Sequence, residues 1–190
     1  MAKRVFIIHA WGGSPEDPLL RWLKSELEKN DFDVVVPKMP NPEKPEIETW
    51  VSKLKEIVEV PDKDTILVGH SIGCQTILRY LEQLHSTSRV GGVVFIAPWL
   101  TLSNLESDDE WQVADSWLNT PIRETDVIKH ISKITAIFSD NDPYVPSENI
   151  EVFKERFNAK VVVEYEKGHF TIDDGVERLE SALHAILKIK

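Results

Sequence analysis

Cysteine is almost absent from this chain of 190 residues, because Cys74 is the only one. A single cysteine excludes an internal disulfide and favours a reducing compartment, so we expect the protein to be cytoplasmic. Long apolar runs are lacking as well, and no stretch approaches the about 20 residues that a membrane span needs. The apolar run Val5–Ile8, which follows Lys3 and Arg4, is too short for the core of a signal peptide. The sequence therefore predicts neither a membrane span nor secretion.

Positive charge is scarce, with 22 Lys and Arg against 32 Asp and Glu and a net charge of −10. This balance disfavours nucleic acid and anionic membranes as partners, and we expect neither. The six histidines show no H-E-x-x-H or comparable ligand spacing, so we expect no metal and no cofactor. We find no repeat, low-complexity tract or linker composition, and the length suits one domain with a sizeable core, which we expect to span residues 1–190.

What the chain does contain is an alternation of β-forming and helical patterns. The expected strands are short and rich in β-branched residues, and they fall at residues 4–9, 32–36, 65–68, 92–97, 134–138 and 160–165. Apolar residues at helical spacing mark helices between and after them, at residues 19–27, 50–58, 72–84, 147–157 and 176–187. Such an alternation predicts an α/β fold with a mainly parallel sheet. Ligands of these sheets bind beyond the carboxyl ends of the strands, so the chemistry should lie there.

Two helix starts have candidate caps in the sequence. Ser14 followed by Pro15 resembles a cap with proline at the first helical position, and predicts that the first helix begins there. Asp173 or Asp174 is expected to cap the last helix.

The chain is organised around Gly69-His70-Ser71-Ile72-Gly73, which fits the pattern G-x-S-x-G. A predicted strand precedes this stretch and a helical pattern follows it, which is the setting of a nucleophile elbow. Glycine is needed on both sides of such a sharp turn because the backbone approaches other atoms closely. The alternative is an ordinary glycine-bounded turn between a strand and a helix.

Two further strand ends supply the partners that a serine nucleophile needs. The order Ser71, Asp142, His169 matches the chain order of a hydrolase triad, and each residue follows a predicted strand. His169 is the candidate base, because imidazole can take the serine proton near neutral pH. For the orienting acid, Asp140 competes with Asp142. We favour Asp142, because Pro143 biases it to an extended conformation, and expect Asp140 to bond within the turn.

The remaining histidines fit the base role less well. His9 and His70 lie at strand ends and are expected to brace the neighbouring loops. His85, His130 and His184 fall on helices or helix ends and are expected to be solvated.

An oxyanion hole needs two N–H donors. We expect one from the backbone of Ile72, the residue after the nucleophile, and the other from Trp11 in the loop after the first strand. Cys74 is expected to be structural, as a small apolar residue packed behind the elbow helix.

Residues 98–124 break the alternation of strands and helices and form a long acidic segment. We interpret it as a substrate-side insertion with a helix or two of its own, in which Trp99, Trp111 and Trp117 are candidate pocket residues. A peripheral packing element is an equally weighted alternative.

Five stretches together resemble the α/β-hydrolases, and within them the small serine hydrolases related to retinoblastoma-binding protein nine and the bacterial YdeN proteins. The stretches span almost the whole chain and are residues 6–11, 39–42, 69–74, 140–146 and 168–170. The most specific are Met39-Pro40-Asn41-Pro42 and the cysteine after the elbow. The resemblance implies a compact three-layer fold with about six strands in the order 2-1-3-4-5-6 and helices on both faces. Ala10 departs from the glycine that many α/β-hydrolases carry after this histidine.

The leading hypothesis is an esterase-type serine hydrolase that acts on a small acyl substrate through an acyl-enzyme. Thioester and amide hydrolysis would use the same groups. A second hypothesis is a protein-interaction module on a hydrolase fold with little turnover, whose protein partner the sequence does not identify. A third is a C–C bond lyase or an acyltransferase that uses the same elbow.

Overall fold

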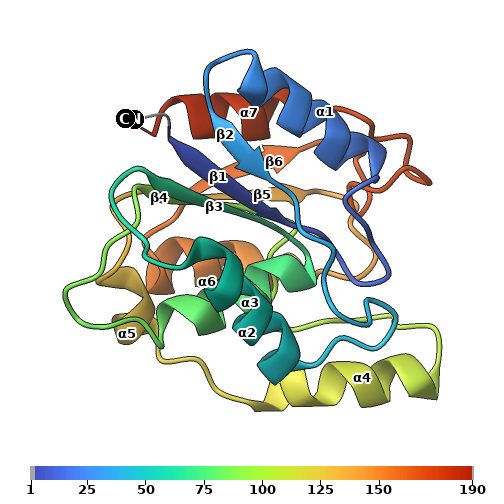
Figure 1. The fold of residues 1–190 in the computed structure, drawn as a ribbon. Coiled ribbons are helices and arrows are strands. Elements are labelled where there is room, and N and C mark those ends of the chain that lie inside the picture. The colour runs from blue at the N-terminus through green and yellow to red at the C-terminus, as the bar shows by residue number, and fades with distance from the viewer. Residues whose placement is uncertain (1–2, 190) are drawn as a thin grey trace.

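The computed structural model describes residues 3–189, which form six strands and seven helices (Figure 1). The strands are β1 (Arg4–Ile8), β2 (Asp33–Val35), β3 (Thr65–His70), β4 (Gly92–Ile96), β5 (Ile134–Ser139) and β6 (Lys160–Glu164). The helices are α1 (Pro18–Glu28), α2 (Ile47–Val58), α3 (Ile72–Leu81), α4 (Asp108–Asn119), α5 (Glu124–Ile128), α6 (Glu148–Arg156) and α7 (Glu180–Leu187).

The strands pair in parallel into one sheet with the order β2-β1-β3-β4-β5-β6. Helices α1 and α7 cover one face of the sheet, and α2, α3 and α6 cover the other (Figure 1). The central strands β3 and β4 are buried along their whole length, because their aliphatic residues contact helices on both faces. The α/β class, the strand order and the helices on both faces are confirmed.

The first helix begins three residues later than the sequence pattern indicates. Asp17 is the cap residue and Pro18 the first helical residue, so the pair Asp17-Pro18 takes the place expected for Ser14-Pro15. The Asp17 carboxylate turns back and accepts hydrogen bonds from the backbone N–H and the hydroxyl of Ser14. Ser14 is thereby part of a turn that precedes the helix.

The last helix also differs from its expected start. It begins at Glu180, with Leu179 as the cap residue, so neither Asp173 nor Asp174 caps it. Residues 170–179 form neither helix nor strand, and the Asp174 carboxylate accepts a hydrogen bond from the backbone N–H of His169.

Residues 98–124 follow β4 and include the whole of α4. Helix α4 begins with a capping box, in which Ser107 accepts from the Glu110 N–H and the Glu110 carboxylate accepts from the Ser107 N–H. Two buried amides hold the start of the segment. Gln75 donates to the Trp99 carbonyl, and Asn149 accepts from the Leu100 N–H at 2.7 Å.

One of the histidines expected to be solvated is buried. His130 lies between α5 and β5, and its Nδ1 is 2.8 Å from the Ser88 carbonyl oxygen, to which it donates. The error arises because the residues after α5 pair with the segment before β4, where the Val90 N–H donates to the His130 carbonyl and Ile131 bridges Val90. His85 and His184 are exposed. Within residues 3–189, no helix is both long enough and apolar enough to cross a membrane.

Candidate active site

The nucleophile elbow lies between β3 and α3. Ser71 has φ 53° and ψ −116°, a backbone conformation that non-glycine residues rarely adopt. A Cβ on Gly69 would clash with the backbone of Cys74, and one on Gly73 would clash with the carbonyl oxygen of Ile8. Both glycines of the pattern are therefore required by close backbone contacts, and the strained conformation of Ser71 distinguishes this turn from an ordinary one.

Ser71, His169 and Asp142 lie in a hydrogen-bonded row at the carboxyl end of the sheet. The Ser71 hydroxyl oxygen is 2.8 Å from His169 Nε2, and His169 Nδ1 is 2.8 Å from Asp142 Oδ2. An ionised carboxylate can only accept, so Nδ1 holds the imidazole hydrogen and Nε2 is left to accept from the serine. The Asp142 side chain is 2% exposed and that of His169 12%, so the row is shielded from water at its acidic end.

The hydrogen bonds of Asp140 and Asp142 assign different roles to these two candidate acids. Asp142 Oδ1 accepts from the backbone N–H groups of Tyr144 and Val145, which orients Oδ2 toward His169. Asp140 is exposed, and its carboxylate accepts from the Glu166 N–H at 2.8 Å. It does not contact the imidazole and acts within the turn.

The end of β5 clamps the loop that holds His169. Four consecutive side chains each accept one hydrogen bond from four consecutive residues of that loop: Asp140 from Glu166 N, Ser139 from Lys167 N, Asn141 from Gly168 N, and Asp142 from His169 Nδ1. The clamp fixes the imidazole through its backbone as well as through its ring. Ser139 and Asn141 have no place in the triad pattern, so motif reasoning did not single them out.

Asp174 fixes the same loop from the other side. Its Oδ2 atom accepts from the backbone N–H of His169 at 2.9 Å and from the N–H and the hydroxyl of Thr171. Gly168, with φ +50°, leaves room for this carboxylate, because a Cβ at that position would overlap it. The only sequence signal was an aspartate five residues after the histidine, which is equally typical of a helix cap.

The loop after β1 is held by His9 and by residues 39–43. His9 Nδ1 donates to the Ala10 carbonyl and Nε2 accepts from the Met39 N–H, which is the hydrogen-bonding pattern of a neutral ring. Burial lowers the pKa of His9, which also favours the neutral form. The Gly12 N–H donates to the Pro42 carbonyl, and the Trp11 indole donates to the Glu43 carbonyl. This explains why a proline-rich stretch far from the elbow belongs to the site.

The two expected oxyanion donors are free of other acceptors. Within residues 3–189, neither the Trp11 nor the Ile72 backbone N–H donates a hydrogen bond to another protein group. Ile72 opens α3, where the first amides of the helix have no partner inside it. Both amides are therefore without a protein acceptor, which is a condition that an oxyanion donor must meet.

His70 braces the loop of His169. Its Nε2 lies 2.8 Å from the His169 carbonyl oxygen and donates to it, and the two rings lie 5.6 Å apart. Burial, and secondarily the nearby His169, lower the pKa of His70 to about 4. His70 is thus neutral and structural at neutral pH.

Cys74 is buried behind the elbow. Its thiol hydrogen points toward the carbonyl oxygens of Gly69 and Ile96, and burial raises the pKa of the thiol far above its usual range. These properties describe an unreactive structural cysteine.

A cavity of about 320 Å³ opens onto the serine and the histidine. Its lining includes aromatic and aliphatic side chains and two glutamates, and comprises Ala10, Trp11, Gly12, Glu43, Ser71, Trp99, Leu102, Leu105, Glu110, Tyr144, His169 and Thr171. The segment that contains Trp99 and Glu110 thus contributes to the cavity wall. The Tyr144 ring stands edge-on to the imidazole at 5.3 Å and was not among the residues that the sequence suggested.

Two of the three tryptophans proposed for the pocket do not line this cavity. Trp117 is buried between α3 and α4, where its indole donates to the Pro45 carbonyl and its ring lies under Arg79. Trp111 is 39% exposed on the outer face of α4. The aromatic composition of the segment does not separate a wall residue from a core residue. Among residues 3–189, no cluster of three or more His, Cys, Asp or Glu is arranged to hold a metal ion.

Comparison with known proteins identifies similar chains. The sequence model of the serine hydrolase family matches residues 5–188. The chain is 28% identical to YdeN of Bacillus subtilis (strain 168), to which a hydrolase activity is ascribed, over 94% of this chain and 92% of that protein. It is 23% identical to the serine hydrolase RBBP9 of Rattus norvegicus, over 85% and 78% of the two chains. The crystal structure of the B. subtilis ydeN product superposes with a TM-score of 0.90 at 26% identity, over 99% and 98% of the chains.

Proposed function

The chain belongs to the serine hydrolase family, and on that basis we propose that it cleaves small carboxylic esters through an acyl-enzyme formed on Ser71. The observation that carries the proposal is the continuous row of short hydrogen bonds from the Ser71 hydroxyl through His169 to Asp142. The strained backbone of Ser71 supports it, because such conformations persist mainly where function needs them.

In the first half of the proposed reaction, the Ser71 oxygen attacks the ester carbonyl carbon while His169 Nε2 takes the hydroxyl proton. Asp142 stabilises the imidazolium that results. The tetrahedral intermediate then collapses, the bond from carbon to the alcohol oxygen breaks, and His169 returns the proton to the departing alcohol. The acyl group is left as an ester of Ser71.

In the second half, a water molecule attacks the acyl carbon and gives one proton to His169. The bond to Ser71 breaks, the serine recovers its proton from the imidazolium, and the carboxylic acid leaves. The Trp11 and Ile72 amides would donate to the carbonyl oxygen as its negative charge develops in both halves.

The volume and the lining of the cavity suit a substrate with a small, uncharged acyl or alcohol group. About 320 Å³ is near the lower end of the range for small-molecule sites. Trp99, Leu102 and Leu105 offer apolar contact, whereas Glu43 and Glu110 disfavour a carboxylate on the substrate. Thioesters and amides are chemically open to the same groups and belong in the test.

A fluorophosphonate probe tests the proposal directly. We expect one probe per chain on the wild-type protein and none on Ser71→Ala, in which ester turnover should fall by up to about 10⁶-fold. Because alanine keeps the Cβ, the strained turn is retained and thermal unfolding should change little. Intact mass after rapid mixing with an activated ester should show an acyl adduct on the wild type alone.

Failure to label and to turn over any member of a panel of esters, thioesters and amides would overturn the proposal. That result would favour a binding module on a hydrolase fold. A cytoplasmic location and the absence of nucleic-acid and membrane partners stay predictions.

A further inference from the structure

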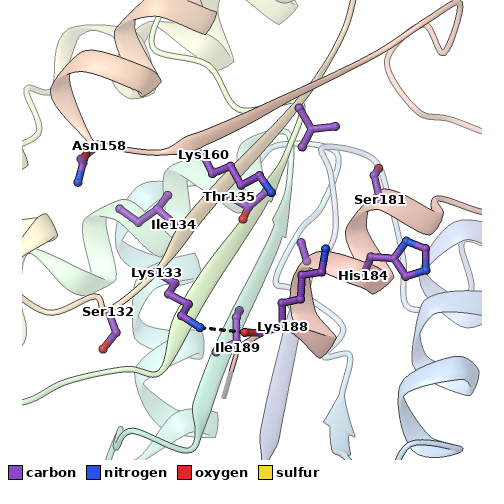
Figure 2. A pocket seen from close by; sticks show the side chains of 12 residues that line it. Ser132, Lys133, Ile134, Thr135, Asn158, Lys160, Ser181, His184, Lys188 and Ile189 are labelled. Carbon is purple, nitrogen blue, oxygen red and sulfur yellow. Dashed lines mark hydrogen bonds between the residues drawn. The ribbon is translucent and has the colours of Figure 1, made fainter.

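A second cavity lies at the opposite end of the sheet from Ser71. It has a volume of about 420 Å³ and lies between α7 and the beginnings of β5 and β6 (Figure 2). Ile134 and Lys160, the first residues of these strands, line it, whereas Asp142 and His169 follow the strands' last residues. Because five or six strand residues span about 17–20 Å, the cavity is separate from the hydrolase site.

The walls of the cavity come from regular positions of three elements. Ser181, His184, Ala185 and Lys188 recur at the spacing of one helical face of α7. Opposite them, Lys160 and Val162 lie on one face of β6, and Thr135 of β5 pairs with Lys160 in the sheet. The sheet and α7 therefore place most of the wall residues, whereas Ser132, Lys133 and Asn158 lie in the segments just before β5 and β6.

The charge of this cavity contrasts with that of the protein. The chain has a net charge of −10, yet the lining includes Lys133, Lys160 and Lys188, and no Asp or Glu. In the part of the chain that the structure describes, none of these three lysines forms an ion pair, whereas Lys24, Lys29, Lys53, Lys129 and Lys154 each pair with a carboxylate. Three unpaired ammonium groups around one hollow attract a multiply charged anion.

Two hydrogen-bonding features add to the charge. Lys133 donates to the Lys188 carbonyl at the end of α7, which holds its ammonium group at the cavity and leaves two of its hydrogens for a ligand (Figure 2). The Ser181 hydroxyl is buried and has no hydrogen-bond partner among residues 3–189. Because this hydroxyl has almost no solvent-accessible surface, it would contact a ligand only after the Ser181 side chain rotated toward the cavity.

The floor of the same cavity is apolar. Ile134, Val162, Ala185 and Ile189 contribute to its lining beside the basic groups. A simple inorganic anion would leave this surface unused, whereas an organic anion would cover it.

We propose that this cavity binds a small organic phosphate, with its phosphate group on Lys133, Lys160 and Lys188 and its organic part on the aliphatic floor. Phosphate fits because it presents several acceptor oxygens and up to two negative charges to point-charge donors such as lysine. The site is independent of the proposed esterase chemistry and would be a regulatory or carrier site.

Titration calorimetry of the purified protein with phenyl phosphate and with inorganic phosphate tests the proposal. We expect one saturable phenyl phosphate site per chain, with inorganic phosphate binding more weakly because it lacks the apolar part. The variant Lys133→Gln/Lys160→Gln/Lys188→Gln should weaken phenyl phosphate binding by about tenfold or more.

The matched control is Lys24→Gln/Lys53→Gln/Lys154→Gln, which removes the same charge from lysines that pair with carboxylates elsewhere. It should retain the wild-type affinity within about twofold. Thermal melts of both variants verify folding, and the single variant Lys160→Gln replaces the triple one if that fails to fold. Equal weakening in both triple variants, or no saturable binding by the wild type, would overturn the proposal. Equal affinity for the two phosphates would refute the role of the apolar floor.

Discussion

Asp174 accepts a hydrogen bond at 2.9 Å from the backbone N–H of His169, the residue proposed as the catalytic base. The same carboxylate oxygen accepts twice more, from Thr171. Asp174 does not touch the imidazole and holds the backbone from which it projects. It is therefore a positioning residue, whose effect should be seen in turnover more than in substrate binding.

We predict that Asp174→Ala lowers kcat by about tenfold and stability by about 1–3 kcal/mol, because several hydrogen bonds to one loop are lost together. Steady-state kinetics on a short ester and urea unfolding measure the two effects. The exposed neighbour Asp173 offers a matched control, and Asp173→Ala should change neither. An Asp174→Ala enzyme with wild-type kcat would show that the clamp from β5 suffices to hold the histidine.

The strands and the residues at their ends were predictable because both depend on local pattern. Buried β-branched runs identify β1, β3 and β4, and parallel strands bring their carboxyl ends to one edge, so Ser71, Asp142 and His169 could be grouped without a structure. The strand order came from family resemblance. No residue pattern in β2, which is three residues long, would have assigned it to the sheet edge.

The partners of polar side chains could not be predicted in the same way. Ser14-Pro15 and Asp17-Pro18 have equivalent local signals for a helix start, and contacts between Asp17 and Ser14 decide between them. Asp174 likewise suits a helix cap by composition, but the tertiary fold places His169 within its reach. Local propensity distinguishes such options weakly, and hydrogen bonds that form only in the folded chain decide between them.

The buried His70 makes stability dependent on pH. Its pKa is lowered to about 4 in the folded protein, against 6.5 for an unperturbed histidine, so the unfolded state binds more protons between these values. Stability contributed by the neutral ring is complete above pH 6.5 and falls as the pH is lowered toward 4. The loss from this group should reach about 2 kcal/mol at pH 5.

Urea unfolding of the wild type and of His70→Gln, at pH 7.5 and at pH 5, measures this contribution. Glutamine keeps a donor for the His169 carbonyl but does not titrate, so the variant should lose less stability on acidification. His9, whose pKa is also lowered by burial, is present in both proteins and cancels in the comparison. Identical losses in the two proteins would exclude His70 as the source.

Glu43, in the lining of the catalytic cavity, should select against anionic substrates. Glu43 lines the cavity, and its exposed carboxylate is not paired with a cation within residues 3–189. We predict that Glu43→Gln raises kcat/KM about two- to fivefold for a hemisuccinate ester relative to an acetate ester of the same alcohol, and that added salt reduces the gain. Glu155→Gln makes the same charge change on α6, away from the cavity, and should leave the ratio unaltered. A similar rise of this ratio in Glu43→Gln and Glu155→Gln would show that the net charge of the protein, and not the position of Glu43, causes the effect.

The last prediction concerns the two aspartates at the end of β5. Asp142 bonds His169 Nδ1, and an amide in its place would favour the wrong imidazole tautomer, so Asp142→Asn should cut turnover by as much as about 10⁴-fold with the fold intact. Asp140 bonds the Glu166 N–H in the clamp, and Asp140→Asn should cost about 1 kcal/mol of stability and little turnover. Turnover and thermal melts of both variants separate the roles. A large loss of turnover confined to Asp140→Asn would reverse the assignment. Comparable losses in both would mean that the imidazole is held as much by the clamped backbone as by its own hydrogen bond to Asp142.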